Sequence, residues 1–369
     1  MQAVILVGGE GTRLRPLTSG IPKPIVTLVD RPFMAYMLQW LHGHGVDDVI
    51  MSCGFLATKV KEVLGDGSDY GISLRFVEEP EPRGTAGALK YAEEFLQDRF
   101  LMLNGDVLTD VDIGAQIAQH ERSGATGTLG LVPVEDPSAY GLVLTEPDGE
   151  VTGFLEKPGP DQLDGVDDYL ISAGIYVLER SVLDLIEPDR KVSIEREVWP
   201  ELVGDGLYGY ADRDAYWLDI GTPQRYLQGT VDILAGEVRT GVLDRLHDGL
   251  AVDGEVDPSA TVLAPAIIEA GARIAAGATV GPGAVVASGA RVQAGAVVER
   301  SVVLDGAVVG EDAVVRDAIV GPRVTIGSRT VAEQETVLGE GVQLGGDNLL
   351  SRGVKVFPGA TVGDGAIRF

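Results

Sequence analysis

Hydrophobic and polar positions follow one pattern in residues 1–235 and a different one after residue 250. In the first part, short apolar runs rich in β-branched residues alternate with longer amphipathic stretches. The short runs predict strands and the amphipathic stretches predict helices. The predicted strands are Ala3–Val7, Val49–Cys53, Leu74–Val77 and Phe100–Leu103, and the predicted helices are Phe33–His42 and Ala86–Phe95. This alternation indicates an α/β domain with a mostly parallel sheet and helices on both faces.

A period of six residues marks the second part of the chain. Aliphatic side chains recur every six positions from Val262 to Leu304, and glycines keep the same period from Gly271 to Gly295. A second register follows at Val308, Val314, Val320 and Ile326. Such a hexad is typical of a parallel β-helix, in which each short strand directs one aliphatic side chain inward. We expect a phase slip after Leu304 and an inserted loop or changed coil within Val331–Leu350.

The two patterns predict a domain division. We expect a catalytic domain at residues 1–235, a linker at 236–252 and a β-helix at 253–369. Solenoids expose flat edges and commonly stack on copies of themselves. We therefore expect a homo-oligomer formed through the β-helix.

Composition narrows the range of partners and compartments. The formal net charge of −27 repels nucleic acid and anionic membrane surfaces, so we exclude both as main partners. Anionic substrates would then need a local group of Lys and Arg and a divalent cation. The single cysteine, Cys53, excludes an intrachain disulfide and fits a reducing compartment. No segment has the length and apolarity of a signal peptide or a membrane span, which predicts a cytoplasmic protein.

The strongest local motif follows the first predicted strand. It reads Gly8-Gly9-Glu10-Gly11-Thr12-Arg13-Leu14, and Pro22-Lys23-Pro24 comes shortly after it. Glycines after a strand let backbone N–H groups approach phosphate oxygens closely. Arg13 adds a forked donor and Lys23 a compact charge, which suits a triphosphate. The glycine spacing differs from that of the Walker A loop and of the dinucleotide-binding fingerprint.

This motif resembles the opening of the nucleoside-diphosphate-sugar pyrophosphorylases. The resemblance extends over residues 2–235 and includes, in order, Gly84-Thr85-Ala86-Gly87, Asn104-Gly105-Asp106, Tyr140-Gly141, Glu156-Lys157-Pro158, Ser193-Ile194-Glu195-Arg196-Glu197 and Trp217-Leu218-Asp219-Ile220-Gly221-Thr222-Pro223. Within the family, the chain is most similar to the mannose-1-phosphate guanylyltransferases that carry a C-terminal left-handed β-helix. The resemblance implies a Rossmann-like nucleotidyltransferase domain followed by a left-handed β-helix.

The resemblance also implies an activity: a nucleoside triphosphate and a hexose 1-phosphate give an NDP-sugar and pyrophosphate. Asp106 and Asp219 match the pair that holds Mg²⁺, which suits a hard cation with oxygen ligands. Arg13 and Lys23 would serve the leaving pyrophosphate and Lys157 the attacking phosphate. These five residues are the predicted catalytic set.

Two sets of binding residues follow from the same motifs. The predicted nucleotide-binding residues are Leu6, Gly8, Gly9, Gly11, Thr12, Arg13, Lys23, Glu79, Gly84, Thr85 and Asp106. The predicted sugar-phosphate-binding residues are Gly141, Glu156, Lys157, Ser172 and Asp219.

The predicted identities of the nucleotide base and of the sugar depend on two positions, Glu79 and Ser172. Glu79 stands where the thymidylyl- and uridylyltransferases of the family tend to carry a Gln, and a carboxylate suits the adjacent N1–H and N2–H₂ donors of guanine. A pyrimidine N3–H could also donate to Glu79. Ser172 stands where mannose-specific members usually carry Asn. This departure favours glucose or a related sugar, so glucose 1-phosphate with GTP, UTP or dTTP stays open. The overall resemblance and Glu79 lead us to expect GTP with mannose 1-phosphate.

Two other functions, an acetyltransferase and a regulatory subunit, fit the sequence less well. Acetyltransferases built on a β-helix typically use a histidine in the repeats, and the four histidines, at positions 42, 44, 120 and 247, all lie outside the hexads. A non-catalytic, sugar-nucleotide-binding regulatory subunit tends to lose phosphate or metal ligands. The chain keeps all five residues of the catalytic set, which favours an enzyme.

Overall fold

The computed structural model describes residues 1–54, 56–163 and 168–368. The chain forms two compact units, each built from separate stretches. Residues 1–9 and 34–218 make the first unit, and residues 10–33 and 219–369 make the second. None of the helices in the described stretches combines the length and apolarity that a membrane crossing requires.

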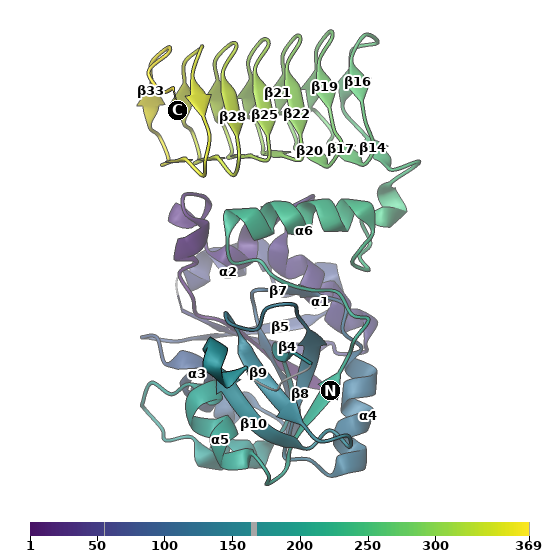
Figure 1. The fold of residues 1–369 in the computed structure, drawn as a ribbon, viewed down its shortest axis with the longest axis vertical. Helices are drawn as coiled ribbons and strands as arrows, with labels where there is room; N and C mark the ends of the chain where they lie inside the picture. The colour runs from purple at the N-terminus through teal and green to yellow at the C-terminus, as the bar shows by residue number, and fades with distance from the viewer. Residues whose placement is uncertain (55, 164–167, 369) are drawn as a thin grey trace. The chain divides into compact units, whose positions relative to one another are not determined.

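A mixed nine-stranded sheet forms the centre of the first unit (Figure 1). Its order is β10-β9-β11-β6-β1-β4-β5, with β8 paired to β11 and β12 paired to β8. The strands are β1 (Gln2–Val7), β4 (Asp48–Cys53), β5 (Ser73–Glu78), β6 (Arg99–Asn104), β8 (Gly127–Pro133), β9 (Gly141–Thr145), β10 (Val151–Glu156), β11 (Leu170–Glu179) and β12 (Leu207–Ala211). The helices are α1 (Phe33–Gly43), α2 (Ala57–Leu64), α3 (Gly84–Tyr91), α4 (Ile113–Ser123) and α5 (Trp199–Leu202). Strands β7 (Val107–Thr109) and β13 (Trp217–Asp219) form a separate pair.

Strands β6, β1, β4 and β5 are the parallel part of this sheet, because β1 pairs in parallel with β4 and β6, and β4 with β5. Their carboxyl ends lie at one edge, where open α/β sheets bind ligands. The four predicted strands are these four, and the predicted helix at residues 33–42 is α1, so these predictions are confirmed. β11 runs antiparallel to β6, which makes the sheet more mixed than expected.

The predicted helix at residues 86–95 is shorter in the structure. Helix α3 ends at Tyr91, and a 3₁₀ turn, Glu93–Phe95, follows it. Arg180 stabilises this turn, because its guanidinium donates to the carbonyls of Glu93 and Leu96. These carbonyls would otherwise need partners at the helix end.

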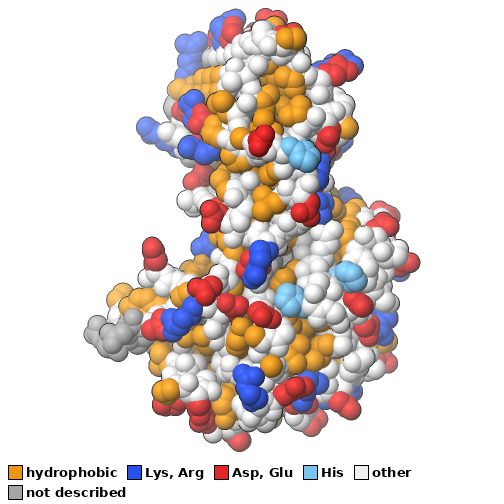
Figure 2. All heavy atoms as spheres, turned by 90° about the vertical axis from the view of Figure 1, so that its right-hand side faces the viewer, with side chains coloured by type: hydrophobic (Ala, Val, Ile, Leu, Met, Phe, Trp, Pro, Cys, Tyr) orange, Lys and Arg blue, Asp and Glu red, His pale blue; other side chains and the backbone are white. Residues whose placement is uncertain are grey.

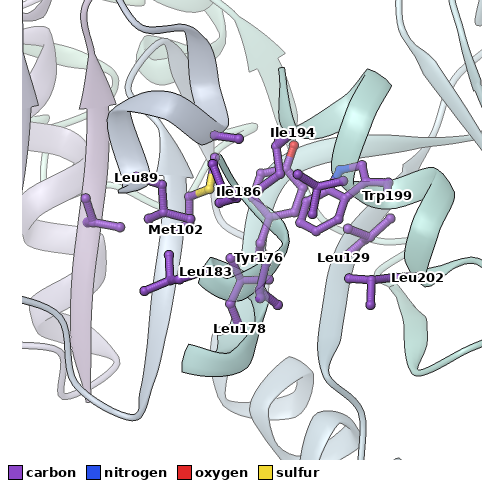
Figure 3. Packing of buried hydrophobic residues seen from close by; sticks show 14 of the residues in the cluster. Leu89, Met102, Leu129, Tyr176, Leu178, Leu183, Ile186, Ile194, Trp199 and Leu202 are labelled. Atoms are coloured by element: carbon purple, nitrogen blue, oxygen red, sulfur yellow. The ribbon is translucent and has the colours of Figure 1, made fainter. Parts of the chain in front are cut away.

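The core of the first unit lies between the sheet, α3 and the segment that ends in α5. Tyr176 on β11 and Trp199 at the start of α5 are almost fully buried, and their ring centroids lie 5.2 Å apart. Figure 3 shows these two rings among Leu129, Met102 and Ile194. Burial of such aromatic area is a main source of folding free energy. This packing holds β11 in place, and β11 carries the candidate site residue Ser172.

Three parallel sheets make the β-helix in the second unit (Figure 1). The first is β14 (Leu250–Val252), β17 (Ala266–Ile268), β20 (Ala284–Val286), β23 (Val302–Val303), β26 (Ile319–Val320), β29 (Val337–Leu338) and β32 (Lys355–Val356). The second is β15 (Glu255–Val256), β18 (Arg273–Ile274), β21 (Arg291–Val292), β24 (Val308–Val309), β27 (Thr325–Ile326), β30 (Gln343–Leu344) and β33 (Thr361–Val362). The third is β16 (Thr261–Val262), β19 (Thr279–Val280), β22 (Val297–Glu299), β25 (Val314–Arg316), β28 (Val331–Glu333) and β31 (Leu349–Leu350). The expected fold class, a left-handed β-helix after a Rossmann-like domain, is confirmed.

Two shortened coils cause the predicted phase slip. Val285 pairs with Val302, and Val302 pairs with Ile319, so each of these coils has 17 residues, whereas Ile319 pairs with Val337 after 18. A single left-handed residue, φ 41° and 46° respectively, turns the shortened corners at Arg300 and Asp317. The next corners use two left-handed residues each, at positions 334–335 and 352–353.

The core positions after the slip differ by one residue from those that the six-residue count indicates. They are Val303, Val309 and Val315 in place of Leu304, Val308 and Val314. The expected inserted loop or changed coil within Val331–Leu350 is wrong. Strands β28 to β31 continue the regular coil there, with Ala332, Leu338, Leu344 and Leu350 in the core. Ala332 fills a position where a larger aliphatic residue was expected, which hid the period.

The second unit also contains the motif loop, helix α6 (Pro223–Ala235) and the pair β2 (Thr27–Leu28) and β3 (Arg31–Pro32). The Tyr226 hydroxyl on α6 donates to the Thr27 carbonyl at 2.6 Å. Arg245 joins the buried Asp30 to Glu269 through ion pairs of 2.6 and 3.1 Å. The hydrogen bonds that Arg245 donates to Glu269 and Asp30 raise its pKa, so this guanidinium stays charged. Acidic side chains are spread widely over the face drawn in Figure 2, in keeping with the net charge of −27.

Candidate active site

The glycine-rich loop follows β1 at the carboxyl edge of the parallel strands. Leu6 near the end of β1 accepts a hydrogen bond from the Gly105 N–H at 3.0 Å, beside the strand end that carries Asp106. Gly8 and Gly9 end the first stretch of the first unit. A Cβ added at Gly9 would meet no atom within 4 Å, so its backbone borders open space. Phosphate oxygens can approach a backbone of this kind.

The rest of the loop belongs to the second unit. Gly11 has φ 61°, which favours glycine, and it precedes a 3₁₀ turn, Thr12–Leu14. The Thr18 hydroxyl donates to the Gly11 carbonyl at 2.7 Å. A Cβ at Gly11 would lie 3.2 Å from Lys23 Cβ, so the absence of a side chain lets Lys23 pack against the loop. Lys23 is 8% exposed, an unusual burial for a lysine.

The side chains of Arg13 and Asp219 both lie close to Gly221. A Cβ added at Gly221 would be 2.9 Å from Arg13 Nη2 and 3.1 Å from Asp219 Oδ2. Asp219 also forms an ion pair with Arg225 in the first turn of α6. The second unit thus brings together two guanidinium groups and one of the two predicted metal ligands.

Sequence reasoning missed Arg225. A cation in the first turn of a helix faces the positive end of the helix dipole, which is unfavourable unless an anion compensates it. In this chain Asp219, six residues earlier, supplies the anion. An arginine two residues after a Thr-Pro helix start was therefore the signal that could have identified it.

Glu79 follows β5 and is 8% exposed. The Ser52 hydroxyl donates to Glu79 Oε1 at 2.9 Å, and the Arg83 backbone N–H donates to Oε2 at 3.3 Å. A Cβ added at Gly8 would lie 3.6 Å from Oε1. The structure therefore brings Glu79 and Gly8, 71 positions apart in the sequence, to the same edge of the sheet. Burial, with Glu79 and Glu78 adding to it, raises the pKa of the neighbouring Cys53 thiol to about 12.

Gly84 and Thr85 open helix α3 next to a loop from the other end of the unit. A Cβ at Gly84, which has φ 72°, would lie 2.5 Å from the Val192 carbonyl oxygen, so only glycine fits. The Thr85 hydroxyl donates to Glu195 Oε2 at 2.9 Å and accepts from the Ile194 N–H at 2.8 Å. Thr85 thus fixes the loop that carries Glu195.

Glu195 is a second residue that the candidate set left out. It lies in a π-helical turn, Ile194–Val198, and its Oε2 also accepts from the Ser193 hydroxyl at 2.7 Å. Turns of this type are frequent at functional sites. The signal was present in the Ser193–Glu197 motif, which matched the family without a role for any of its side chains.

Gly141 and Glu156 face each other across the antiparallel strands β9 and β10. A Cβ at Gly141 would lie 3.2 Å from Glu156 Oε2 and 2.6 Å from Phe154 Cζ. Lys157 follows with φ 55°, and its N–H donates to the Tyr140 carbonyl at 2.8 Å. Its Nζ lies 3.5 Å from Glu156 Oε1, and 59% of the side chain is exposed.

Ser172 lies on β11 before an irregular step in the pairing of β11 with β8. Its hydroxyl donates to the Tyr176 hydroxyl at 3.1 Å. Burial raises the pKa of Tyr176, and the carboxylates of Glu195, Glu156 and Asp106 add to this effect. These carboxylates come from three separate segments of the first unit.

Asp106 follows β6 and is partly buried. It belongs to the first unit and Asp219 to the second, so their joint metal site stays a prediction. The described residues hold no group of three or more His, Cys, Asp or Glu side chains arranged for a metal ion.

Comparisons with known proteins show the family of this chain. The nucleotidyl transferase family matches residues 2–236, and the GMPPB C-terminal domain matches residues 262–366. The chain is 37% identical over 284 residues to a mannose-1-phosphate guanylyltransferase of Mycobacterium tuberculosis, covering 73% of this chain and 76% of that protein. It is 37% identical over 270 residues to a mannose-1-phosphate guanyltransferase of Schizosaccharomyces pombe, covering 71% and 73%.

Among solved structures, the chain is similar to HddC from Yersinia pseudotuberculosis, with a TM-score of 0.54 and 29% identity. That match covers 62% of this chain and 97% of HddC. On the match over residues 2–236, and on relatives aligned over more than two thirds of both chains, this chain belongs to the nucleotidyl transferase family and is a nucleotidyltransferase enzyme.

Proposed function

We propose that this enzyme transfers the guanylyl group of GTP to mannose 1-phosphate, giving GDP-mannose and pyrophosphate. The observation that carries the proposal is the buried carboxylate of Glu79 beside Gly8. The relatives from Mycobacterium tuberculosis and Schizosaccharomyces pombe, which are named for this reaction, support the same base and sugar.

Glu79 favours guanine because, among the described residues, no Lys or Arg side chain neutralises its carboxylate. In the described part of the chain, its hydrogen-bond donors are one hydroxyl and one backbone N–H, and no Lys or Arg forms an ion pair with it. A nearly buried anion served by two neutral donors gains from further donors. Guanine supplies two through N1–H and N2–H₂, whereas a pyrimidine supplies only N3–H.

The reaction needs positioning more than covalent help from the protein. An oxygen of mannose 1-phosphate attacks the α-phosphorus of GTP, the new P–O bond forms in line, and the bond to pyrophosphate breaks. Arg13 and Lys23 neutralise the charge that develops on the pyrophosphate, and Lys157 holds the attacking phosphate. The attacking phosphate is already ionised at neutral pH, so no general base is required.

Members of this family generally use a divalent metal, and we propose Mg²⁺. The donor set fits it, since Asp106 and Asp219 are carboxylates and Mg²⁺ prefers oxygen ligands and keeps several waters and phosphates. Mg²⁺ supplies charge neutralisation on the phosphates. Arg225 holds the Asp219 carboxylate beside Arg13.

The choice of sugar depends on residues other than Glu79. The Ser172 hydroxyl donates to Tyr176 and accepts from the Gly174 N–H at 3.4 Å, so it can accept one hydrogen bond from a sugar hydroxyl but donate none. Glu156, beside Gly141, is the better candidate for reading the hexose. Glucose 1-phosphate is therefore the second candidate substrate.

The experiment is pyrophosphate release by the purified protein with Mg²⁺. It crosses GTP, ATP, UTP and dTTP with mannose 1-phosphate and glucose 1-phosphate. We expect the highest kcat/KM for GTP with mannose 1-phosphate. Preference for a pyrimidine nucleotide would refute the role of Glu79, and preference for glucose 1-phosphate would refute mannose as the substrate.

We further propose that the enzyme acts in the cytoplasm as a homo-oligomer formed through the β-helix, with small-molecule substrates as its partners. Light scattering coupled to size exclusion tests the assembly. A monomer at micromolar concentration would refute it.

A further inference from the structure

We propose that Ser52 is a positioning residue that sets base selectivity by fixing the Glu79 carboxylate. The inference rests on the proposed role of Glu79 in reading guanine. Ser52 lies on β4, paired with Leu6 of β1 on one side and Val77 of β5 on the other. It is fully buried, and a hydroxyl in the interior of a parallel sheet needs a polar partner.

That partner is Glu79, 27 residues later. The Ser52 hydroxyl donates to Oε1 at 2.9 Å, and the Arg83 N–H donates to Oε2. The Glu79 backbone is held as well, because its N–H donates to the Cys53 carbonyl at 2.8 Å. Each carboxylate oxygen therefore has one fixed donor, which sets the plane of the carboxylate.

A fixed plane matters for a base that offers two parallel donors. Bidentate contacts discriminate between bases because both hydrogen bonds form in one geometry. Without the Ser52 hydroxyl, Oε1 would lose its donor and the carboxylate could rotate about its last bond. A rotated carboxylate still accepts one hydrogen bond, so it would bind guanine and hypoxanthine with similar strength.

Inosine triphosphate is the probe, because hypoxanthine keeps N1–H and lacks the 2-amino group. The quantity measured is the ratio of kcat/KM for GTP to kcat/KM for ITP. Both nucleotides are assayed on one preparation, so any loss of folded protein cancels in the ratio. We expect Ser52→Ala to lower the ratio roughly fivefold to tenfold, the size expected for the net contribution of one typical hydrogen bond.

Two further variants separate positioning from general damage. Ser301→Ala removes a hydroxyl that is also fully buried and donates to the Glu299 carbonyl at 2.7 Å, far along the chain in the β-helix. We expect it to leave the ratio unchanged. In a Glu79→Gln background, Ser52→Ala should lower the ratio no further, because Ser52 acts through the carboxylate.

The inference is overturned if Ser52→Ala keeps the ratio within twofold of the wild type. It is also overturned if Ser301→Ala lowers the ratio equally, or if the loss is the same in the Glu79→Gln background. A wild-type enzyme that prefers UTP or dTTP would instead refute the proposed function itself.

Discussion

At Gly221, one added methyl group should displace the side chains of the candidate site without lowering the stability of the fold. Its backbone is not left-handed, so alanine causes no backbone strain there. The added Cβ would lie 2.9 Å from Arg13 Nη2 and 3.1 Å from Asp219 Oδ2. Both neighbours are tips of flexible side chains, so they would move while the backbone stays in place.

The size of the effect follows from these distances. An ordinary contact requires Arg13 Nη2 to retreat by about half an ångström. A misplacement of about 1 Å costs on the order of a hundredfold in rate, so we expect roughly a tenfold loss of kcat/KM for the nucleoside triphosphate. This loss corresponds to about 1.4 kcal/mol of transition-state stabilisation.

The assay is steady-state pyrophosphate release by Gly221→Ala, with a thermal unfolding scan of the same protein. Gly241→Ala is the matched control, because Gly241 is exposed and a Cβ there would meet no atom within 4 Å. We expect both variants to melt within about 2 °C of the wild type. Equal kcat/KM values for the two variants would refute the argument that Arg13 and Asp219 act from this position.

Three further changes test the metal site, a backbone contact and the β-helix core. Asp106→Asn should abolish turnover with Mg²⁺ while circular dichroism stays unchanged, and near-normal activity would contradict the metal assignment. Gly84→Ala should destabilise the protein by about 2–4 kcal/mol in urea unfolding, since a left-handed alanine would also collide with the Val192 carbonyl; a loss below about 0.5 kcal/mol would contradict this. Val315→Ala, in the fully buried β-helix core, should cost about 1–3 kcal/mol in the same measurement, and a neutral result would mean that the core collapses around the gap.

The sequence was most informative where a period or a motif repeats a local physical requirement. The parallel strands β1, β4, β5 and β6 and the helix α1 lie where apolar runs predicted them. The β-helix core followed the six-residue period up to Val298 and matched the second predicted register again from Val320. Between these residues the prediction moved by one position, because corners at Arg300 and Asp317 are shortened without any glycine to mark them. The domain boundaries at residues 235 and 252 stay predictions.

The candidate site was predictable as a set of motifs and unpredictable as a set of contacts. Glu79 could be chosen from its place in the chain, but its partner Ser52 depends on the register between β4 and β5. The Thr85–Glu195 hydrogen bond joins residues 110 positions apart and has no sequence signal. Such contacts appear only when the strands and loops are assembled.

The acidic character of the chain also bears on how it binds polyanions. At physiological ionic strength the screening length is about 8 Å, so a distant carboxylate contributes little at the site and the local charges decide. There, Lys23 is nearly buried, Arg13 lies within reach of Asp219, and Arg225 pairs with that carboxylate. At the proposed metal site, a cation bound to the nucleotide would reduce the repulsion between its phosphates and the carboxylates of Asp106 and Asp219. The carboxylates that repel free phosphates would then attract the metal complex, which favours the nucleotide arriving with its cation.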